Sequence, residues 1–346
     1  MQKNKEVFHK QTLKTKARVL LKRMLFGTDV STVEFRLRRE RLRELIRQFT
    51  FRANERRDFL NMLNSDYPQL KIKMLDIGSR SGLMEPFIYL MRLNNFYLEG
   101  FEPDKAEAEA ILKSGKFGNY SKIHPVALSN KSGKIPLYIT KMLGCSSIYK
   151  PNLNDMKYYT NSNYYEIQKK IIIPVTTLAK IYPNGEQFDF ISMDVQGAEH
   201  KVLSGGREIL KNAIGISFEA NFIEIYEKQK LFHDMHKLML DNDFRLISLG
   251  AGDTDGEITE CGTCVYIKKN NLIKNKEDLL KRILFSLLWD KKSYAEFLIR
   301  NHGDRFLSPA EKREILRKLR IKIKEKMSTK HDGIVARYYE HGEGYM

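Results

Sequence analysis

Two short segments of this 346-residue sequence place glycines and carboxylates where a nucleoside-type cofactor could bind. In Met74-Leu-Asp-Ile-Gly-Ser-Arg-Ser-Gly82, an apolar stretch leads into a turn with two glycines. Such a turn lets the backbone approach a ligand, and a following helix, expected near Leu83, offers amide donors at its N-terminus. In Gly100-Phe-Glu-Pro-Asp104, Glu102 ends the next apolar stretch and could bind both hydroxyls of a ribose. Taken alone, the glycine turn is explained by an ordinary turn between a strand and a helix, and Glu102 by a solvated carboxylate. Together the two segments predict a nucleotide-like cofactor. Arg80 stands where a dinucleotide fingerprint has its middle glycine, which disfavours NAD.

A third acidic segment, Phe188-Asp-Phe-Ile-Ser-Met-Asp-Val-Gln-Gly-Ala-Glu199, could supply a base that takes a proton from a hydroxyl. Asp194, which ends an apolar stretch, is the first candidate. The other candidates are Glu199, His200 and Glu219. Structural alternatives exist for three of them: a helix cap for Asp194, a first-turn dipole role for Glu199, and an ordinary surface position for His200.

These residues need a fold that brings strand ends together, and the pattern from about residue 71 predicts one. Short apolar stretches alternate with helical ones, which is typical of βα units on a parallel sheet. The predicted strands are Ile72–Ile77, Phe96–Phe101, Ser121–Leu128, Phe188–Asp194, Ile214–Glu219, Phe244–Leu249 and Thr263–Ile267. Open α/β sheets bind ligands at the carboxyl ends of their strands. The carboxylates predicted to converge there are Asp76, Glu102, Asp194 and Glu219.

An insertion and two helical flanks complete the chain. The insertion, Lys134–Pro174, carries hairpin-like strands at Ile135–Thr140 and Ile171–Val175 around a loop rich in Tyr and Asn. The predicted division is a basic helical N-terminal extension (1–66), an α/β domain (67–269) and a basic helical C-terminal extension (270–346). The capping box of Ser308-Pro-Ala-Glu311 predicts a helix through about Glu325.

The charge is concentrated in the flanks. Residues 1–58 hold 17 Lys and Arg against 7 Asp and Glu, and residues 268–346 hold 20 against 11, whereas 59–267 hold 23 against 25. The central domain therefore need not bind a polyanion. An amphipathic stripe, Leu13–Leu25, has basic edges that suit an anionic membrane surface, with a solvated face or a homo-oligomer contact as the alternatives.

Further segments give the central part a specific resemblance. They are Val126-Ala-Leu-Ser-Asn130, Gly144-Cys-Ser-Ser-Ile148, Pro174-Val-Thr-Thr-Leu178 and Ser217-Phe-Glu-Ala220. In this order, with the three acidic segments, they resemble the FkbM-type family of S-adenosylmethionine-dependent methyltransferases over about residues 70–268. The resemblance implies a Rossmann-like class I methyltransferase fold with a seven-stranded sheet. Departures from the family pattern are Ser79-Arg80, Ala179, Met193 and Gln196, the last two beside the expected reacting centre.

The resemblance also implies a role for each matching residue. Asp76, Gly78 and Ser79 would surround the methionine part of the cofactor, and Gly82, which would let the following helix pack close to the strand, is counted with the cofactor-binding residues. Glu102 would hold the ribose. The adenine pocket would be lined by Ala127, Leu128 and Ser129. Asp194 would face the sulfonium and the acceptor.

The expected activity is O-methylation of a hydroxyl on a sugar or glycan, for which the Tyr-rich loop Tyr149–Tyr165 has a suitable composition. Two other classes stay open: a nucleic-acid methyltransferase, disfavoured because no two prolines are adjacent and none precedes a Cys, and a cofactor-binding scaffold without turnover.

No metal is expected, because Cys261-Gly-Thr-Cys264 has no second Cys or His pair. No apolar stretch approaches about 18 residues, so we expect a cytoplasmic protein, with the basic flanks allowing a peripheral position at the inner face of the membrane.

Overall fold

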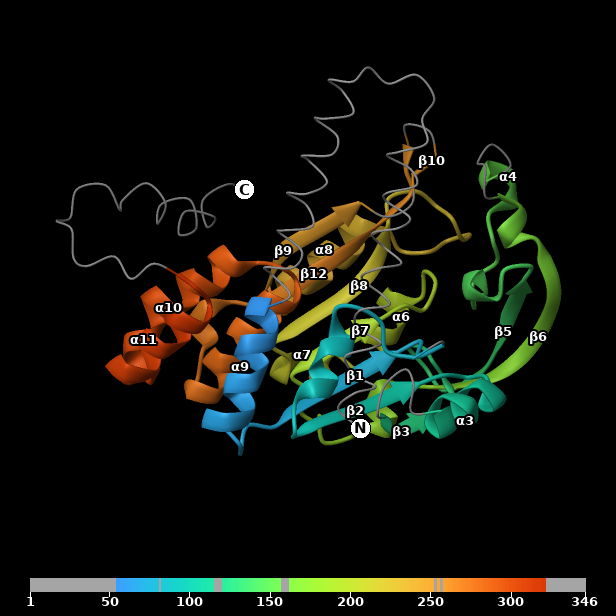
Figure 1. The fold of residues 1–346 in the computed structure, drawn as a ribbon. Helices are drawn as coiled ribbons and strands as arrows, with labels where there is room; N and C mark the ends of the chain where they lie inside the picture. Colours follow the sequence, from blue (N-terminus) through green and yellow to red (C-terminus); the bar gives the residue numbers. More distant parts are fainter. Residues whose placement is uncertain are drawn as a thin grey trace, which may run out of the picture.

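The computed structural model describes residues 54–80, 82–114, 120–156, 162–251, 254–255 and 258–321. Its centre is a sheet in the order β3-β2-β1-β7-β8-β12-β9 (Figure 1). The strands are β1 (Ile72–Ile77), β2 (Phe96–Phe101), β3 (Tyr120–His124), β7 (Phe190–Met193), β8 (Gly215–Asn221), β9 (Phe244–Ala251) and β12 (Cys261–Lys268). β12 runs antiparallel to both of its neighbours, whereas the pairs from β3 to β8 are parallel. The predicted seven-stranded, Rossmann-like class I methyltransferase fold is confirmed.

One predicted strand, Ser121–Leu128, is in fact two. β3 ends at His124, and β4 (Ala127–Leu128) belongs to a separate sheet. Pro125 lies at the break, where it has no N–H to continue the ladder with β2. The chain therefore leaves the central sheet at the carboxyl end of β3.

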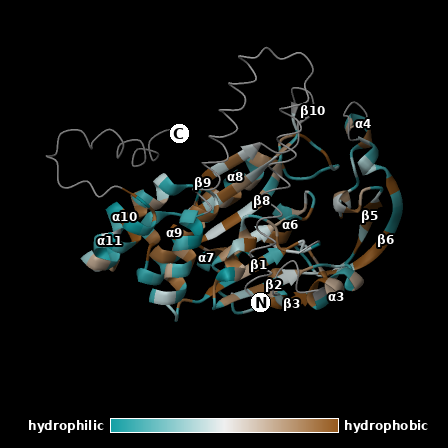
Figure 2. Cartoon of the chain, in the orientation of Figure 1, coloured by the Kyte–Doolittle hydropathy of each residue, from teal (hydrophilic) through white to brown (hydrophobic). Residues whose placement is uncertain are grey.

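Helices cover the two faces of the central sheet. One face packs against the helix over residues 54–66 and against α9 (Lys276–Leu288), and the other against α6 (Glu199–Ser204), α7 (Glu208–Asn212) and α8 (Phe232–Asp241). The alternation along β1 explains this, because Ile72 and Met74 face the first layer while Leu75 and Ile77 face the second. Figure 2 shows the resulting hydrophobic strands between more hydrophilic helices.

The predicted insertion forms a second, three-stranded sheet. β5 (Gly133–Thr140) pairs antiparallel with β6 (Ile167–Thr176), and β4 pairs parallel with β6. Three short helical turns lie between β5 and β6: η2 (Leu143–Cys145), α4 (Leu153–Met156) and η3 (Ser162–Tyr165). We call the described residues of 127–176 the arm; it lies at the opposite end of the view from α10 (Lys292–Phe306) and α11 (Pro309–Lys318) (Figure 1).

The helix expected near Leu83 is absent. Residues 82–86 are irregular, and a 3-10 helix, η1 (Phe87–Arg92), follows. Pro86 explains the difference, because a helix starting at Leu83 would need the N–H of its fourth residue and Pro has none. The first glycine turn consequently offers no α-helix N-terminus to a ligand.

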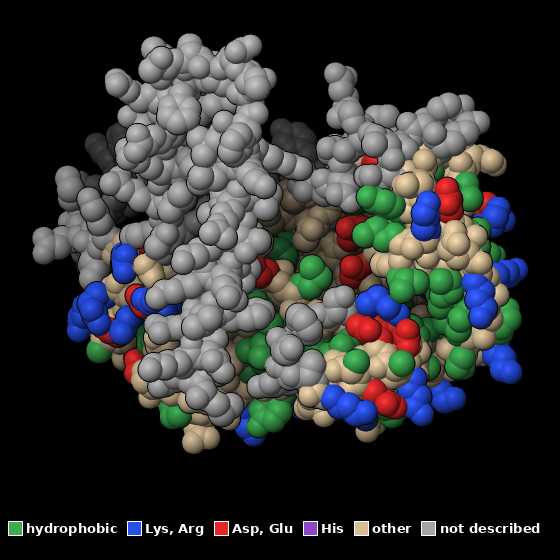
Figure 3. Space-filling model, turned by 45° about the vertical axis from the view of Figure 1, so that its right-hand side comes forward, with side chains coloured by type: hydrophobic (Ala, Val, Ile, Leu, Met, Phe, Trp, Pro, Cys, Tyr) green, Lys and Arg blue, Asp and Glu red, His purple; other side chains and the backbone are tan. Residues whose placement is uncertain are grey.

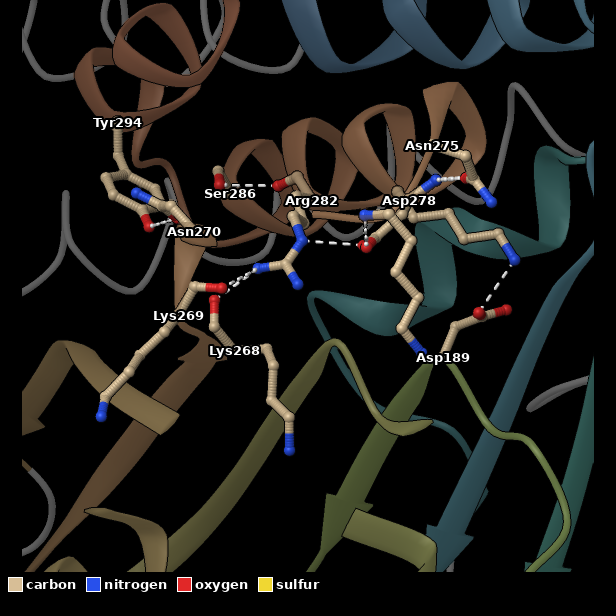
Figure 4. Close-up of polar contacts among 11 residues, drawn as sticks. Asp189, Lys268, Lys269, Asn270, Asn275, Asp278, Arg282, Ser286 and Tyr294 are labelled. Atoms are coloured by element: carbon tan, nitrogen blue, oxygen red, sulfur yellow. Dashed lines mark hydrogen bonds and ion pairs between the residues drawn. The ribbon is translucent and has the colours of Figure 1, made fainter. Parts of the chain in front are cut away.

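One buried ion pair joins α9 to the residue before β7, and a second ion pair lies within α9 (Figure 4). Lys281 Nζ lies 2.8 Å from Asp189 Oδ1, and Arg282 Nε lies 2.7 Å from Asp278 Oδ1. Arg282 also donates to the backbone carbonyl oxygens of Lys268 and Lys269. Arg282 is 1 % exposed, so its charge is satisfied inside the protein.

The C-terminal capping box is confirmed: Ser308 accepts from Glu311 N, and the Glu311 side chain accepts from Ser308 N. The helix ends at Lys318, before the predicted Glu325. The predicted stripe Leu13–Leu25 lies outside the described residues. Within the described ranges, no helix is long and apolar enough to cross a membrane.

Candidate active site at the carboxyl ends of the strands

Polar side chains follow the apolar ones on the α9-facing side of the sheet. In register across the strands, Asp76 of β1 lies beside Ser192 of β7, which lies beside Ser217 of β8. Residues in register share a face, and Asp76 is two positions beyond the buried Met74. Two residues further along β8, and on the same face as Ser217, Glu219 lies beside Thr263 of β12. The carboxyl ends thus carry a polar surface, and Figure 3 shows Asp and Glu side chains in the hollow at the middle of this view.

Asp76 is buried within this surface and hydrogen-bonded. The Tyr120 hydroxyl donates to Asp76 Oδ2 at 2.5 Å, and Ser79 Oγ donates to the Asp76 backbone oxygen at 2.9 Å. Desolvation raises the pKa of Asp76 to about 6, although the hydrogen bond from Tyr120 opposes the shift. Gly100 makes this arrangement possible, because a Cβ there would lie 2.5 Å from Ser79 Oγ and 2.7 Å from the Tyr120 ring.

The glycine turn serves a different purpose from the one predicted. Gly78 has a φ of +88°, and a Cβ on it would lie 1.9 Å from the backbone oxygen of Asp194. The space expected for a ligand is therefore occupied by the next strand end. The amides of Gly78 and Ser79 both donate to Phe101 O at 3.0 Å, and Gly82 N donates to Ser79 O at 2.8 Å. The turn packs closely against the backbone of Asp194. Its amide groups already donate to backbone oxygens of the protein, so they are not available to a ligand.

Glu102 follows β2, as predicted, and is 3 % exposed. Its Oε1 accepts from Asp104 N at 2.8 Å and lies 3.7 Å from Arg80 NH2, which also contacts Asp104 at 3.1 Å. Desolvation raises the pKa of Glu102. Among the described residues no hydrogen bond is made to Oε2, so this oxygen could accept one from a ligand.

Replacing Glu102 with Ala is expected to weaken cofactor binding by about 1.5–3 kcal/mol, the usual value of a charge-assisted hydrogen bond. Calorimetry with S-adenosylhomocysteine measures it. Glu109→Ala, on the exposed part of α3 (Lys105–Ser114), is the control for general effects of charge. Equal affinity in a folded Glu102→Ala variant would contradict the placement of the ribose.

Asp194 is the candidate base that is open to solvent. Its side chain is exposed, yet protein lies around it on enough sides that desolvation raises the pKa of its carboxyl group. Gln196 Nε2 donates to Asp194 Oδ1 at 2.6 Å. The turn is held by left-handed backbone at Gln196 (φ 53°) and Gly197 (φ 87°). Asp194 is therefore both fixed and accessible, as a base requires.

Glu199 is placed close to Asp194 but is buried, at 5 % exposure. Its Oε1 accepts from Val195 N at 3.0 Å, which closes the turn before α6. Desolvation, with the nearby charges of Asp194 and Glu219, raises the pKa of Glu199 to about 8. Its position matches the structural alternative considered for it.

The burial of Glu199 makes a pH-dependent stability expected. An acid whose folded-state pKa is raised holds its proton longer in the folded protein, so its stabilising contribution falls as pH rises from about 4.5 to about 8. The free energy of unfolding should fall by at most about 1.4 kcal/mol per pH unit over this range. Glu199→Gln, which cannot ionise, should show a weaker fall in Tm between pH 5 and pH 8.5. Parallel curves for both proteins would refute the assignment.

The remaining predicted residues are less closely associated with the strand ends. His200 Nδ1 lies 3.3 Å from Ser204 Oγ, and the charges acting on it are those of Asp234, Lys230 and Arg207, so it faces away from Asp194. The three residues expected around adenine are buried: Ala127, Leu128 and Ser129. Leu128 packs in the core with α6, and Ser129 N donates to Thr176 O at 2.9 Å.

Three polar residues of this site were not predicted. Tyr120 holds Asp76, and the Tyr226 hydroxyl lies 2.9 Å from both Gln196 Oε1 and Cys145 O, either of which can accept its one hydrogen. Ser147 Oγ donates to Gln196 O at 2.6 Å. Ser147 belongs to a segment used for the resemblance, whereas Tyr226 lies in a loop with no motif to signal it.

The sequence matches the family model described as the Methyltransferase FkbM domain over residues 76–246. Residues 76–246 belong to the FkbM methyltransferase family. The match begins at Asp76 and includes Glu102, the arm and Asp194, so the FkbM domain holds the strand-end site just described. S-adenosylmethionine is the methyl donor that goes with this family.

Comparison with solved structures gives matches of low similarity to this chain. Magnesium protoporphyrin IX methyltransferase from Synechocystis PCC 6803 with bound SAM is 11 % identical, with a TM-score of 0.32, over 76 % of this chain and 96 % of that one. The StiE O-MT segment is also 11 % identical, with a TM-score of 0.32, over 84 % and 90 %. No curated protein matches the sequence.

The residues of the FkbM domain fit S-adenosylmethionine. Glu102 offers a buried carboxylate oxygen to the ribose, and the acidic surface of Asp76 and Asp194 suits a cationic sulfonium. Within the described residues, no group of three His, Cys, Asp or Glu is arranged to hold a metal ion.

Proposed function

We propose that this FkbM domain transfers a methyl group to a hydroxyl, with Asp194 as the base. The observation that carries the proposal is the exposed carboxylate of Asp194, held by Gln196 at the end of β7. Bound S-adenosylmethionine supplies an electrophilic methyl group. As the hydroxyl oxygen bonds to that methyl, its proton passes to Asp194, and the carbon–sulfur bond breaks. Positioning contributes much of the rate of such a displacement.

The proposed acceptor is a sugar or glycan, bound beneath the arm. Of the tyrosines in the Tyr149–Tyr165 loop, Tyr164 is 41 % exposed and offers a face on which a sugar ring can stack. Its neighbour in the arm, Met142, is also exposed and donates its amide to Tyr164 O at 3.1 Å. Tyr149 and Tyr165 support the arm instead: Lys201 Nζ lies 4.2 Å above the Tyr149 ring, and Tyr165 packs edge-on against Tyr226. Tyr158 and Tyr159 lie outside the described residues.

A panel of free sugars, glycosides and oligosaccharides, incubated with S-adenosylmethionine carrying a labelled methyl group, tests the proposal. Transfer to a hydroxyl, located by NMR of the product, would support it. Tyr164→Ala should raise KM for the preferred sugar, whereas Tyr97→Ala, at a similarly exposed tyrosine of β2, should not. Transfer to RNA or DNA alone would favour the nucleic-acid class. Cofactor binding without transfer to any acceptor would favour the scaffold.

A further inference from the structure

Asp194 is connected to the arm through a row of polar atoms that lie within hydrogen-bond distance of one another. Gln196 Nε2 lies 2.6 Å from Asp194 Oδ1, Gln196 Oε1 lies 2.9 Å from the Tyr226 hydroxyl, and that hydroxyl lies 2.9 Å from the backbone oxygen of Cys145. Tyr226 is 1 % exposed, and its ring centroid is 5.9 Å from that of Tyr165. The row therefore runs from a solvent-open carboxylate to a fixed carbonyl acceptor.

This row can be satisfied in two directions. When Asp194 is ionised, it accepts from the Gln196 amide NH2, and Gln196 Oε1 accepts the single hydrogen of the Tyr226 hydroxyl. When the proton of Asp194 is on Oδ1, the oxygen that faces Gln196, its hydrogen needs an acceptor there. A half-turn of the amide then brings Oε1 to Asp194 and NH2 to the Tyr226 oxygen, while Tyr226 donates to the carbonyl of Cys145. The side chains of Asp194, Gln196 and Tyr226 each keep a partner in both states, whereas the carbonyl of Cys145 receives the Tyr226 hydrogen only in the second. This matters because an unpaired polar group costs about 1–3 kcal/mol when buried.

Gln is suited to this position because one rotatable group carries both a donor and an acceptor. A Glu there would place a second carboxylate against ionised Asp194 and leave Asp194 Oδ1 without its donor. The backbone around Gln196 is held independently of its amide, since Ser147 Oγ donates to Gln196 O and the residue has a φ of 53°. The amide can turn without disturbing the loop.

We propose that Gln196 is a positioning residue that serves Asp194 in both of its protonation states, turning its amide when Asp194 gains a proton. This rests on the proposed function, which makes Asp194 the group that takes the hydroxyl proton. Only that proton is transferred; the hydrogens of Gln196 and Tyr226 stay on their own atoms and change partners. Because Tyr226 also contacts Cys145 of the arm, the hydrogen bonding of the arm changes with the protonation state of the proposed base, Asp194.

The other titratable groups that face Asp194 are Asp76 of β1, Glu199 of α6 and Tyr226 of the loop after β8. The charges of Asp76 and Glu199 disfavour ionisation of Asp194. Both residues are common to the wild type and to variants at position 196, so a comparison between these proteins isolates the effect of Gln196.

NMR of the full chain, without cofactor, tests the inference independently of activity. The probes are ¹³C-labelled Asp carboxyl carbons and ¹⁵N-labelled Gln side-chain amides, followed from pH 4 to pH 9, with Asp194→Asn and Gln196→Glu used to assign the two signals. We expect the Gln196 amide to titrate with the same midpoint as Asp194, and its protons to contact the Tyr226 ring only below that midpoint. In Gln196→Glu, the Asp194 midpoint should rise by about one pH unit or more.

Tyr182→Phe is the matched control, because Tyr182 also donates a hydroxyl to a polar side chain, Glu99, away from this row. It should leave both titrations unchanged. An amide whose protons remain against Asp194 at every pH would overturn the inference, as would an unchanged Asp194 midpoint in Gln196→Glu. If the amide turns but no hydroxyl is methylated by the wild type, the proposed function fails and the inference about Gln196 stands.

Discussion

Replacing Asp194 with Asn is expected to lower kcat by about 10²–10⁴-fold while the protein stays folded. The amide has the shape of the carboxylate and can still hydrogen-bond to Gln196, so the turn before α6 should persist. It cannot take a proton from a hydroxyl, however, and it removes a negative charge near the sulfonium. Steady-state kinetics with a preferred acceptor measures the loss.

The control for Asp194→Asn is cofactor affinity. Binding of S-adenosylhomocysteine by calorimetry should change far less than kcat, because the ribose is assigned to Glu102. Wild-type turnover in a folded Asp194→Asn protein would reject Asp194 as the base. Glu219, on the same face of the sheet, would then be the next candidate, ahead of the buried Glu199 and the outward-facing His200.

Replacing Gly78 with Ala is expected to reduce both stability and activity strongly. The new Cβ would lie 1.9 Å from the backbone oxygen of Asp194, and the residue would be held at a φ of +88°. Left-handed backbone and overpacking each cost about 1–3 kcal/mol, so together we expect about 2–6 kcal/mol of lost stability. The displaced Asp194 should also lower kcat by about 10²-fold, as expected for misplacement by about 1 Å.

Gly185→Ala separates the cost of left-handed backbone from the cost of the contact with Asp194. Gly185 also has a positive φ, +66°, but the nearest atom to a Cβ there is 3.7 Å away. It should therefore lose only the backbone part of the stability and no activity, as measured by thermal unfolding and kcat. If both variants behaved alike, contact with Asp194 would not be what requires a glycine at position 78.

The strands were predictable because they are short apolar stretches, and the stretch that forms β1 is buried on both faces. β1 and β2 match their predicted bounds residue for residue, since the central strands of a parallel sheet alternate between two helix layers. The helix at Leu83 was wrongly predicted because a glycine turn after a strand usually precedes a helix. In this chain Pro86 overrides that local pattern.

The site was predictable only where its residues end strands. Asp76, Glu102, Asp194 and Glu219 all occupy the predicted edge of the sheet, because strand order carries them there. The partners that orient them come from elsewhere in the chain: Tyr120 and Tyr226 reach the site through tertiary packing. No spacing within a single segment contains that information.

The packing of α9 on the sheet also determines when the chain can complete its fold. Phe285 occupies the space over Gly215, where a Cβ would lie 2.4 Å from its ring, and Lys281 neutralises the buried Asp189. The apolar face of β1 and β7 is thus covered by a helix that is synthesised after every strand of the sheet. On the ribosome, the part of this face that α9 covers must stay exposed or be protected by a chaperone until residue 288 has left the exit tunnel. The segment 76–246, although it holds the whole candidate site, would present an open hydrophobic surface if expressed alone.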